Sequence, residues 1–321
     1  MSEITSITQI PGIFAGHATN ETAATGCTVI ICPEGATGAV DVRGGAPATR
    51  ETDLLRPEET VQVVHAIVLS GGSAYGLAAS TGVAEELERR DIGLDVMVAK
   101  VPIVSGACLF DLMCGDAHVR PDAAMGAEAV AAALDNAGEP LARGNVGAGT
   151  GCTVGKVAGA ERCMKTGLGE CVRQAGELVC GAVAAVNAVG NVVNPQMSTP
   201  VAGVLAADGS RIITVEEAFA EAAAAMPLRT NTTISCVVTN AKLTKAEATK
   251  VAQMSADAYA HAIRPTHTTN DGDSIFVMAT GEVDAQVDMV GMLATAALEG
   301  AIVDAARSAV GAYGLKAAGD L

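Results

Sequence analysis

The chain has 321 residues, a formal net charge of −16 and only 2% aromatic residues. A strongly acidic surface repels phosphate groups, so we expect the protein to bind neither nucleic acid nor an anionic membrane surface. Because 50% of the residues are hydrophobic and 17% are charged, the composition excludes a disordered chain and predicts a core of aliphatic side chains.

Three features predict a cytoplasmic protein. No apolar run reaches the roughly 18 residues of a membrane-spanning helix, and the N-terminus lacks the basic and apolar blocks of a signal peptide. The nine cysteines show no CxxC or zinc-finger spacing, which favours free thiols used as small apolar residues in a reducing compartment. The five histidines form no pair with metal-ligand spacing, so we expect no metal site.

Apolar strands and Ala-rich helices alternate along the first half of the chain. Strands are predicted at 27–32, 39–42 and 61–69. Helices are predicted at 74–90 and 123–136. No composition break marks a domain boundary.

The second half continues the alternation. Residues 178–193 are β-branched and interrupted by glycine, which favours a strand over a helix. A helix at 215–225, a strand at 232–239, a helix from 245, a strand at 274–280 and a long helix at 287–308 follow. Thr214 with Glu217, and Thr244 with Glu247, have the spacing of capping boxes. Alternating elements with small residues between layers predict a layered α/β or α+β sandwich.

Two glycine-rich segments resemble functional loops but lack essential residues. Residues 149–156 (GTGCTVGK) have Thr150 where a P-loop needs glycine, and Val157 replaces the magnesium-binding hydroxyl. Residues 71–75 (GGSAY) lie at a strand-to-helix turn but lack the second glycine of a nucleophile elbow. A triad of Ser73 with His261 or His267 stays open, although a tight turn is the preferred interpretation.

The bond between Asn231 and Thr232, at the start of a predicted buried strand, offers a more specific chemistry. If the Thr232 hydroxyl attacked the preceding carbonyl, an N-to-O acyl shift and hydrolysis would free the α-amine of Thr232. An α-amine has a pKa of about 7.7–8.0, so it can take the hydroxyl proton near neutral pH. Threonine with its own α-amine is a known variant of the Ser–His arrangement.

Eight segments of the chain resemble the DmpA-type family, which contains L-aminopeptidase/D-Ala-esterases, β-peptidyl aminopeptidases and nylon-oligomer hydrolases. They occur in the family's order and cover nearly the whole chain: GIFAGHATN (12–20), 25–55, IVLSGGSAYGLAASTGV (67–83), VPIVSGACLFDL (101–112), GNVGAGTGCTVGK (144–156), VNAVGNVV (186–193), NTTISCVVTNAKLTK (231–245) and THTTNDGDSIFVMATG (266–281).

The resemblance implies an enzyme that cuts itself once, between Asn231 and Thr232. The resulting α fragment (1–231) and β fragment (232–321) would form one αββα sandwich of the DmpA and ornithine acetyltransferase type. Such heterodimers would assemble into a homo-oligomer, often a tetramer. The implied activity is hydrolysis of small peptides, β-peptides, amino-acid amides or ω-amino-acid oligomers through an acyl-enzyme at Thr232, without metal or organic cofactor.

The resemblance also implies roles for other residues. Asn187 matches the asparagine whose amide helps to stabilise the oxyanion, and Lys156 matches the lysine near the nucleophile in the nylon-hydrolase branch. Asp271 and Asp273 stand where the peptidase branch has Ser-x-Glu, and Asp-x-Asp is similar to the nylon-oligomer hydrolases. Independently of the family, a carboxylate could hold the new α-amine, and a lysine would lower its pKa by repulsion.

Two other functions remain open at this point. An acyltransferase of the ornithine acetyltransferase type would use the same self-cleaving threonine with an amine as acceptor, although no extended match to its motifs is present. A non-catalytic relative would keep the fold and an intact chain.

Overall fold

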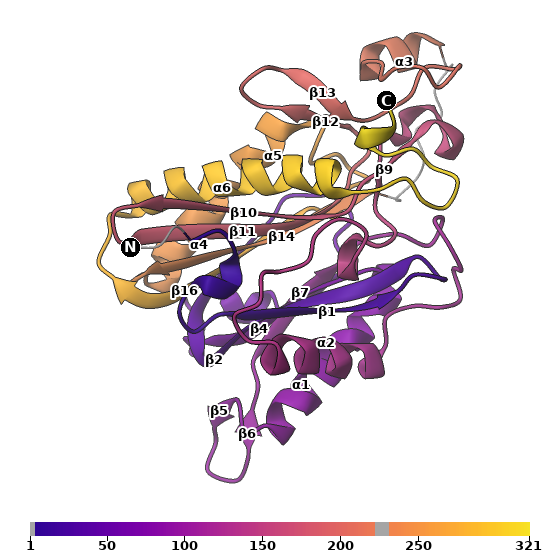
Figure 1. The fold of residues 1–321 in the computed structure, drawn as a ribbon. Helices are drawn as coiled ribbons and strands as arrows, with labels where there is room; N and C mark the ends of the chain where they lie inside the picture. The colour runs from indigo at the N-terminus through magenta and orange to yellow at the C-terminus, as the bar shows by residue number, and fades with distance from the viewer. Residues whose placement is uncertain (1–3, 222–230) are drawn as a thin grey trace.

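The computed structural model describes residues 4–221 and 231–321 and shows four layers (Figure 1). Two β-sheets pack face to face, with a pair of helices outside each. Helices α1 (Ala79–Arg89) and α2 (Ala123–Asp135) cover one sheet, and α4 (Lys245–Ser255) and α6 (Val287–Ser308) cover the other. This arrangement is the predicted αββα sandwich.

The long strand β2 belongs to both sheets. Its first half pairs with β1 and β4, and its second half pairs with β16. The first sheet has the order β1-β2-β4-β7-β3 and the second β10-β11-β14-β16-β2. The strands are β1 (Phe14–Asn20), β2 (Thr25–Val42), β3 (Thr49–Arg50), β4 (Val64–Ser70), β7 (Val104–Cys108), β10 (Leu168–Ala175), β11 (Leu178–Asn187), β14 (Thr232–Ala241) and β16 (Ser274–Val283).

Two parallel strand pairs bring the starts of distant segments together. β4 and β7 are parallel and are joined through α1, and β14 and β16 are parallel and are joined through α4 and α5 (Asp257–Ala262). β11 runs antiparallel to β14. The C-terminal end of β11 therefore lies at the same edge as the starts of β14 and β16.

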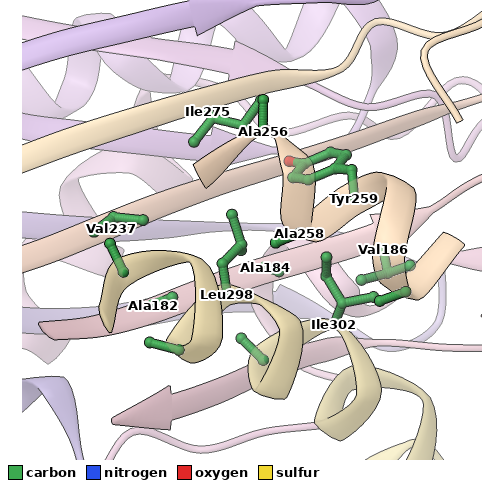
Figure 2. Close-up of a cluster of buried hydrophobic side chains, with 14 of the residues drawn as sticks. Ala182, Ala184, Val186, Val237, Ala256, Ala258, Tyr259, Ile275, Leu298 and Ile302 are labelled. Atoms are coloured by element: carbon green, nitrogen blue, oxygen red, sulfur yellow. The ribbon is translucent and has the colours of Figure 1, made fainter. Parts of the chain in front are cut away.

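Alternation along the buried strands divides the core into layers. In β14, Ile234, Cys236 and Val238 belong to the apolar cluster between the sheets. Val237 belongs instead to the cluster beneath α4, α5 and α6. Figure 2 shows Leu298 and Ile302 of α6 over β11, where only small side chains leave room for the helix. The predicted core of small aliphatic residues is confirmed.

Helix α6 has the predicted bounds. Its length and hydropathy resemble those of a membrane-spanning helix, which the sequence analysis did not expect in this chain. It is 22 residues long with a mean hydropathy of 1.5, enough to cross a membrane by length and composition alone. In the most apolar stretch of 18 residues in α6, 56% is buried inside the protein. We therefore interpret α6 as a core helix that packs on β10 and β11.

Three predicted strands were wrong in their boundaries. The strands expected at 27–32 and 39–42 form one strand, because β2 continues past Pro33 with a register shift between Ile31 and Ala36. The strand expected at 178–193 is two strands, β11 and β12 (Asn191–Asn194), because the chain turns after Asn187.

Most helix boundaries follow the capping residues. Both capping boxes form: Glu217 N–H donates to Thr214 Oγ1 at 3.1 Å, and Glu247 N–H donates to Thr244 Oγ1 at 3.3 Å. The helix expected at 74–90 begins as a 3-10 turn over Ser73–Ala78 before α1. Helix α3 covers Val215–Glu221, and the rest of the expected 215–225 helix lies outside the described residues.

Short strands complete the structure. β13 (Thr199–Ala202), β12 and β15 (Ile263–Arg264) form a three-stranded sheet, while β5 (Leu94–Asp95) pairs with β6 (Lys100–Val101) and β8 (Thr153–Val154) with β9 (Met164–Lys165). The side chain of Asn191 is structural here, since it accepts from Val204 N–H at 2.9 Å and donates to the Ile213 carbonyl at 2.8 Å. All nine cysteines are free thiols, and seven of them are buried.

Candidate active site

The residues predicted for the site converge at the edge where β11 ends and β14 begins. Thr232 is the cross-strand partner of Asn187. An isolated bridge pairs Asn231 with Asp271 in the turn that leads into β16. Lys156 reaches the same place through Asn187, so residues more than 100 positions apart meet around one peptide bond.

The hydroxyl of Thr232 lies at the carbonyl group that it would have to attack. It donates a hydrogen bond to the Asn231 carbonyl. The N–H of Gly272 donates to the same oxygen at 3.2 Å, so a backbone donor already faces the atom where negative charge would develop. Thr232 is only 4% exposed, and the polarising contact is therefore shielded from bulk water.

Glycine at position 272 is required by this contact. A Cβ there would lie 2.8 Å from Thr232 Oγ1 and 2.9 Å from the Ala46 carbonyl oxygen. The sequence analysis singled out the two aspartates on either side and missed the glycine. The available signal for this requirement was that a glycine stands between the two aspartates in the sequence.

Lys156 and Asn187 form a buried polar pair beside Thr232. Lys156 Nζ donates to Asn187 Oδ1 at 2.6 Å and to the Asn187 carbonyl at 2.9 Å. Burial lowers the pKa of Lys156 to about 8. Asn187 Oδ1 also accepts from Thr153 N–H at 3.1 Å, and Asn187 Nδ2 donates to the Phe110 carbonyl at 2.7 Å. The Asn187 amide is therefore fully oriented, and its N–H₂ group already has an acceptor in this uncut chain.

The two aspartates have different surroundings. Asp271 Oδ2 accepts from Thr268 N–H at 2.7 Å, while its buried Oδ1 has no hydrogen-bond partner among the described residues. Burial, reinforced by the charge of Asp273, raises the pKa of Asp271 to about 6. Asp273 Oδ1 accepts from Thr233 N–H at 2.7 Å, so this carboxylate holds the backbone directly after Thr232.

His267 and Tyr259 adjoin the site, and the sequence analysis did not place them there. His267 Nδ1 lies 2.9 Å from Asp273 Oδ2, and the imidazole stacks on the Tyr259 ring with centroids 5.3 Å apart. Sequence reasoning had considered His267 only as a partner of Ser73. The short interval between His267 and Asp273 was the available signal in the sequence. This interval does not reveal the positive φ of +54° at His267, with which the residue contacts Asp273.

A cavity of about 150 Å³ opens beside Lys156 and Thr153. Its walls are mostly apolar, with Asp111 as a buried carboxylate. It is lined by Phe110, Asp111, Met113, Cys114, Gly151, Thr153, Lys156, Ala160, Cys163, Tyr313 and Leu315. Because Thr153 and Lys156 both bind Asn187, this cavity is adjacent to the Thr232 end of the sheet.

The glycine-rich segments rejected as P-loop and elbow have structural explanations. Residues 149–156 carry Thr153 and Lys156 to Asn187. At the other segment, Asp111 accepts from Gly72 N–H at 2.7 Å and from the Thr25 hydroxyl at 2.6 Å, which fixes the turn before Ser73. Within residues 4–221 and 231–321, no group of three or more His, Cys, Asp or Glu side chains is arranged to hold a metal ion.

Comparisons with known proteins show the family of this chain. The model of peptidase family S58 matches residues 5–318. An uncharacterized aminopeptidase of Mycobacterium leprae is 42% identical over 294 residues, 87% of this chain and 80% of the relative. A 6-aminohexanoate-oligomer endohydrolase of Paenarthrobacter ureafaciens is 35% identical over 277 residues, 85% of this chain and 74% of the relative.

Solved structures share the fold at low sequence identity. A β-aminopeptidase of Burkholderia sp. superposes with a TM-score of 0.68 at 20% identity, covering 98% of this chain and 91% of that one. The L-aminopeptidase D-Ala-esterase/amidase of Ochrobactrum anthropi, described as a variant of the Ntn hydrolase fold, has a TM-score of 0.68 at 16% identity, with coverages of 96% and 88%. The family match over nearly the whole chain means that this protein belongs to peptidase family S58 and is a hydrolase of amide or peptide bonds.

Proposed function

We propose that this protein is a self-processing amidohydrolase whose nucleophile is Thr232, freed by cleavage after Asn231. The observation that carries the proposal is the contact of the Thr232 hydroxyl with the Asn231 carbonyl, to which Gly272 N–H also donates. A nucleophile, a scissile carbonyl and an oxyanion donor thus meet at one buried bond.

Maturation would proceed as an acyl shift. Thr232 Oγ1 forms a bond to the Asn231 carbonyl carbon, and the C–N bond breaks as the nitrogen takes the hydroxyl proton. Water then hydrolyses the ester, leaving a carboxylate on Asn231 and a free amine on Thr232. Both polar atoms of the Asn231 side chain are buried without a partner in the described part of the chain, which costs about 1–3 kcal/mol per group. Departure of Asn231 after the cut would remove this cost.

Turnover would reuse the same groups. The α-amine of Thr232 takes the hydroxyl proton, Thr232 Oγ1 forms an ester with the substrate carbonyl carbon, and the leaving amine receives the proton as its C–N bond breaks. Water then hydrolyses this ester, which releases the acid and returns a proton to Thr232 Oγ1. Asp271, whose Oδ1 has no hydrogen-bond partner among the described residues, would hold the α-amine, and the nearby Lys156 charge would lower the pKa of that amine. Asn187 would contribute to the oxyanion site once its amide exchanges the Phe110 carbonyl for substrate. Asp273 would fix the backbone at Thr233. No step in this scheme uses a cofactor.

The substrate class we propose is small peptides, β-peptides, amino-acid amides or ω-amino-acid oligomers. The names of the relatives, an aminopeptidase and a 6-aminohexanoate-oligomer endohydrolase, support it. The pair Asp271 and Asp273 favours the oligomer branch. The small cavity beside Lys156 is suited to a short acyl chain.

The decisive experiment is the intact mass of the purified protein under denaturing conditions. We expect two species, of 231 residues and of 90 residues, from a chain of 321. A single full-length species that nevertheless hydrolyses an amino-acid anilide would contradict the proposal. Formation of an acylated amine in preference to free acid, when an amine acceptor is added, would indicate the acetyltransferase alternative instead. An intact, inactive chain would indicate the non-catalytic alternative.

We further propose a cytoplasmic homo-oligomer, most simply a tetramer of processed heterodimers. Light scattering coupled to size-exclusion chromatography would measure the assembly directly. A single 32.0 kDa particle would refute it.

A further inference from the structure

Asp273 accepts four hydrogen bonds. Its Oδ1 accepts from Thr233 N–H, and its Oδ2 accepts from Thr266 Oγ1 at 3.1 Å and from His267 N–H at 3.0 Å. His267 Nδ1 is a fourth partner, at 2.9 Å from Oδ2. A carboxylate oxygen offers about two lone-pair positions, so Oδ2 is fully occupied, while Oδ1 holds the backbone directly after Thr232. Asp273 thus connects His267 to the backbone at Thr233.

His267 contacts this carboxylate with both its backbone and its ring. The double contact needs the positive φ of +54°, which non-glycine residues seldom adopt. Strain of this kind persists where the surrounding structure enforces it, and it concentrates at functional sites. Because an ionised carboxylate only accepts, the contact indicates that Nδ1 carries the proton.

The other face of His267 is fixed by Tyr259. The rings stack with an interplanar angle of 20°. The Tyr259 hydroxyl lies 2.9 Å from Ser235 Oγ and donates to the Thr233 carbonyl at 3.2 Å. Figure 2 shows Tyr259 on α5, in the same buried cluster as Leu298 and Ile302 of α6. Thr233 is thus held at its N–H by Asp273 and at its carbonyl by Tyr259, the two groups between which His267 lies.

The second ring nitrogen of His267, Nε2, indicates that packing alone does not explain why this residue is a histidine. His267 Nε2 is buried and has no hydrogen-bond partner among the described residues. An unsatisfied buried polar atom is costly, and a phenyl ring would stack on Tyr259 without that cost. The contact that only a nitrogen donor provides is the one to Asp273.

We propose that His267 is a positioning residue for the nucleophile. It orients Asp273, which fixes Thr233 N–H and so the backbone that carries the Thr232 hydroxyl and, after cleavage, its amine. The inference rests on the proposed function of Thr232 and assigns His267 no contact with substrate.

Two variants that both tolerate positive φ test this role. His267→Asn keeps a side-chain N–H donor in a residue that adopts the left-handed region readily, whereas His267→Gly removes the donor. Both lose the ring stacked on Tyr259, so any common loss measures packing alone. We expect kcat of fully cleaved His267→Gly to fall about tenfold or more, because small displacements of a nucleophile are costly. His267→Asn should stay within about threefold of wild type, and KM should change little in either variant.

His261→Gly and His261→Asn are the matched controls, since the half-exposed His261 of α5 binds Glu299 of α6. Rates are measured with an amino-acid anilide, and melting temperatures are recorded for all variants. Equal kcat in His267→Gly and His267→Asn, or wild-type kcat in His267→Gly, would overturn the proposal. If His267→Gly does not fold, a kcat of His267→Asn more than about tenfold below wild type would also overturn it. If Thr232→Ala remained active, the proposed function itself would fail, and the two failures are therefore distinguishable.

Discussion

Ser73 and Thr232 are two hydroxyl residues at strand ends, and their surroundings differ sharply. Ser73 follows β4 with a φ of +55°, as expected of a strained turn, and the nearby Asp111 already accepts from Gly72 N–H and Thr25. Thr232 begins β14 next to Asn187 and at the Asn231 carbonyl that Gly272 also contacts.

The difference teaches that a strained turn alone does not make a nucleophile. At Ser73 the carboxylate holds the turn together. At Thr232, one carboxylate holds the backbone and a second, Asp271, has an oxygen without a partner in the described residues. Groups with unused capacity and shifted pKa values mark a catalytic site better than backbone conformation does.

The largest expected effect tests whether Thr232, and not Ser73, is the nucleophile. Thr232→Ala removes the hydroxyl, so we expect a folded, uncut chain with activity lower by about 10⁴-fold or more. Ser73→Ala should be cut and active within about twofold of wild type. Intact mass and anilide hydrolysis measure both, and loss of cleavage in Ser73→Ala with retention in Thr232→Ala would reverse our assignment.

The next effect separates the two aspartates near Thr232. Asp271→Asn keeps the shape but removes the charge, and its amide nitrogen can occupy the side where Oδ1 has no partner among residues 4–221 and 231–321. We expect turnover to fall by about 10²-fold while the melting temperature stays within a few degrees. An unchanged rate would remove Asp271 from the site.

The turnover rate should depend on the ionisation of Asp271. As the pH falls through about 6, Asp271 becomes protonated and no longer offers a carboxylate to the α-amine of Thr232, so kcat should fall about tenfold per pH unit. Anilide hydrolysis by the cleaved protein in buffers of different pH measures this acid limb. Asp271→Asn should lose the limb near pH 6, and an unchanged limb in Asp271→Asn would assign it to another group.

The smallest effect concerns stability. Asp273→Asn places an amide N–H₂ against backbone donors whichever way it is oriented, so we expect a loss of about 1–3 kcal/mol in the free energy of unfolding. Asp111→Asn is the control at the Ser73 turn. There the amide oxygen can keep Gly72 N–H and the Thr25 hydroxyl can rotate to accept, so its loss should be smaller. Urea unfolding compares the two, and a greater loss in Asp111→Asn would contradict this account.

Much of the fold was predictable because local signals and tertiary structure agree. Helix α6 has the expected bounds, and α4 begins at its predicted capping box. The errors arose where a strand changes partner, as in β2, or where an apolar run contains a turn, as after Asn187. The hydrophobic pattern of the sequence indicates that the residues before and after such a position are buried. It does not indicate which neighbouring strand they pair with.

The candidate site likewise has features that could be predicted from the sequence and features that only the structure reveals. Thr232 was identifiable from the chemistry of its bond to Asn231, and Asn187, Lys156, Asp271 and Asp273 from the resemblance to the DmpA-type family; the roles of all five remain predictions. The separate surroundings of the two aspartates, the need for glycine at 272 and the place of His267 depend on parallel pairing of β14 with β16 and on one positive φ. The sequence by itself determined which chemical groups are available. Only the tertiary structure decided which of them have unused hydrogen-bonding capacity, because that depends on neighbours distant along the chain.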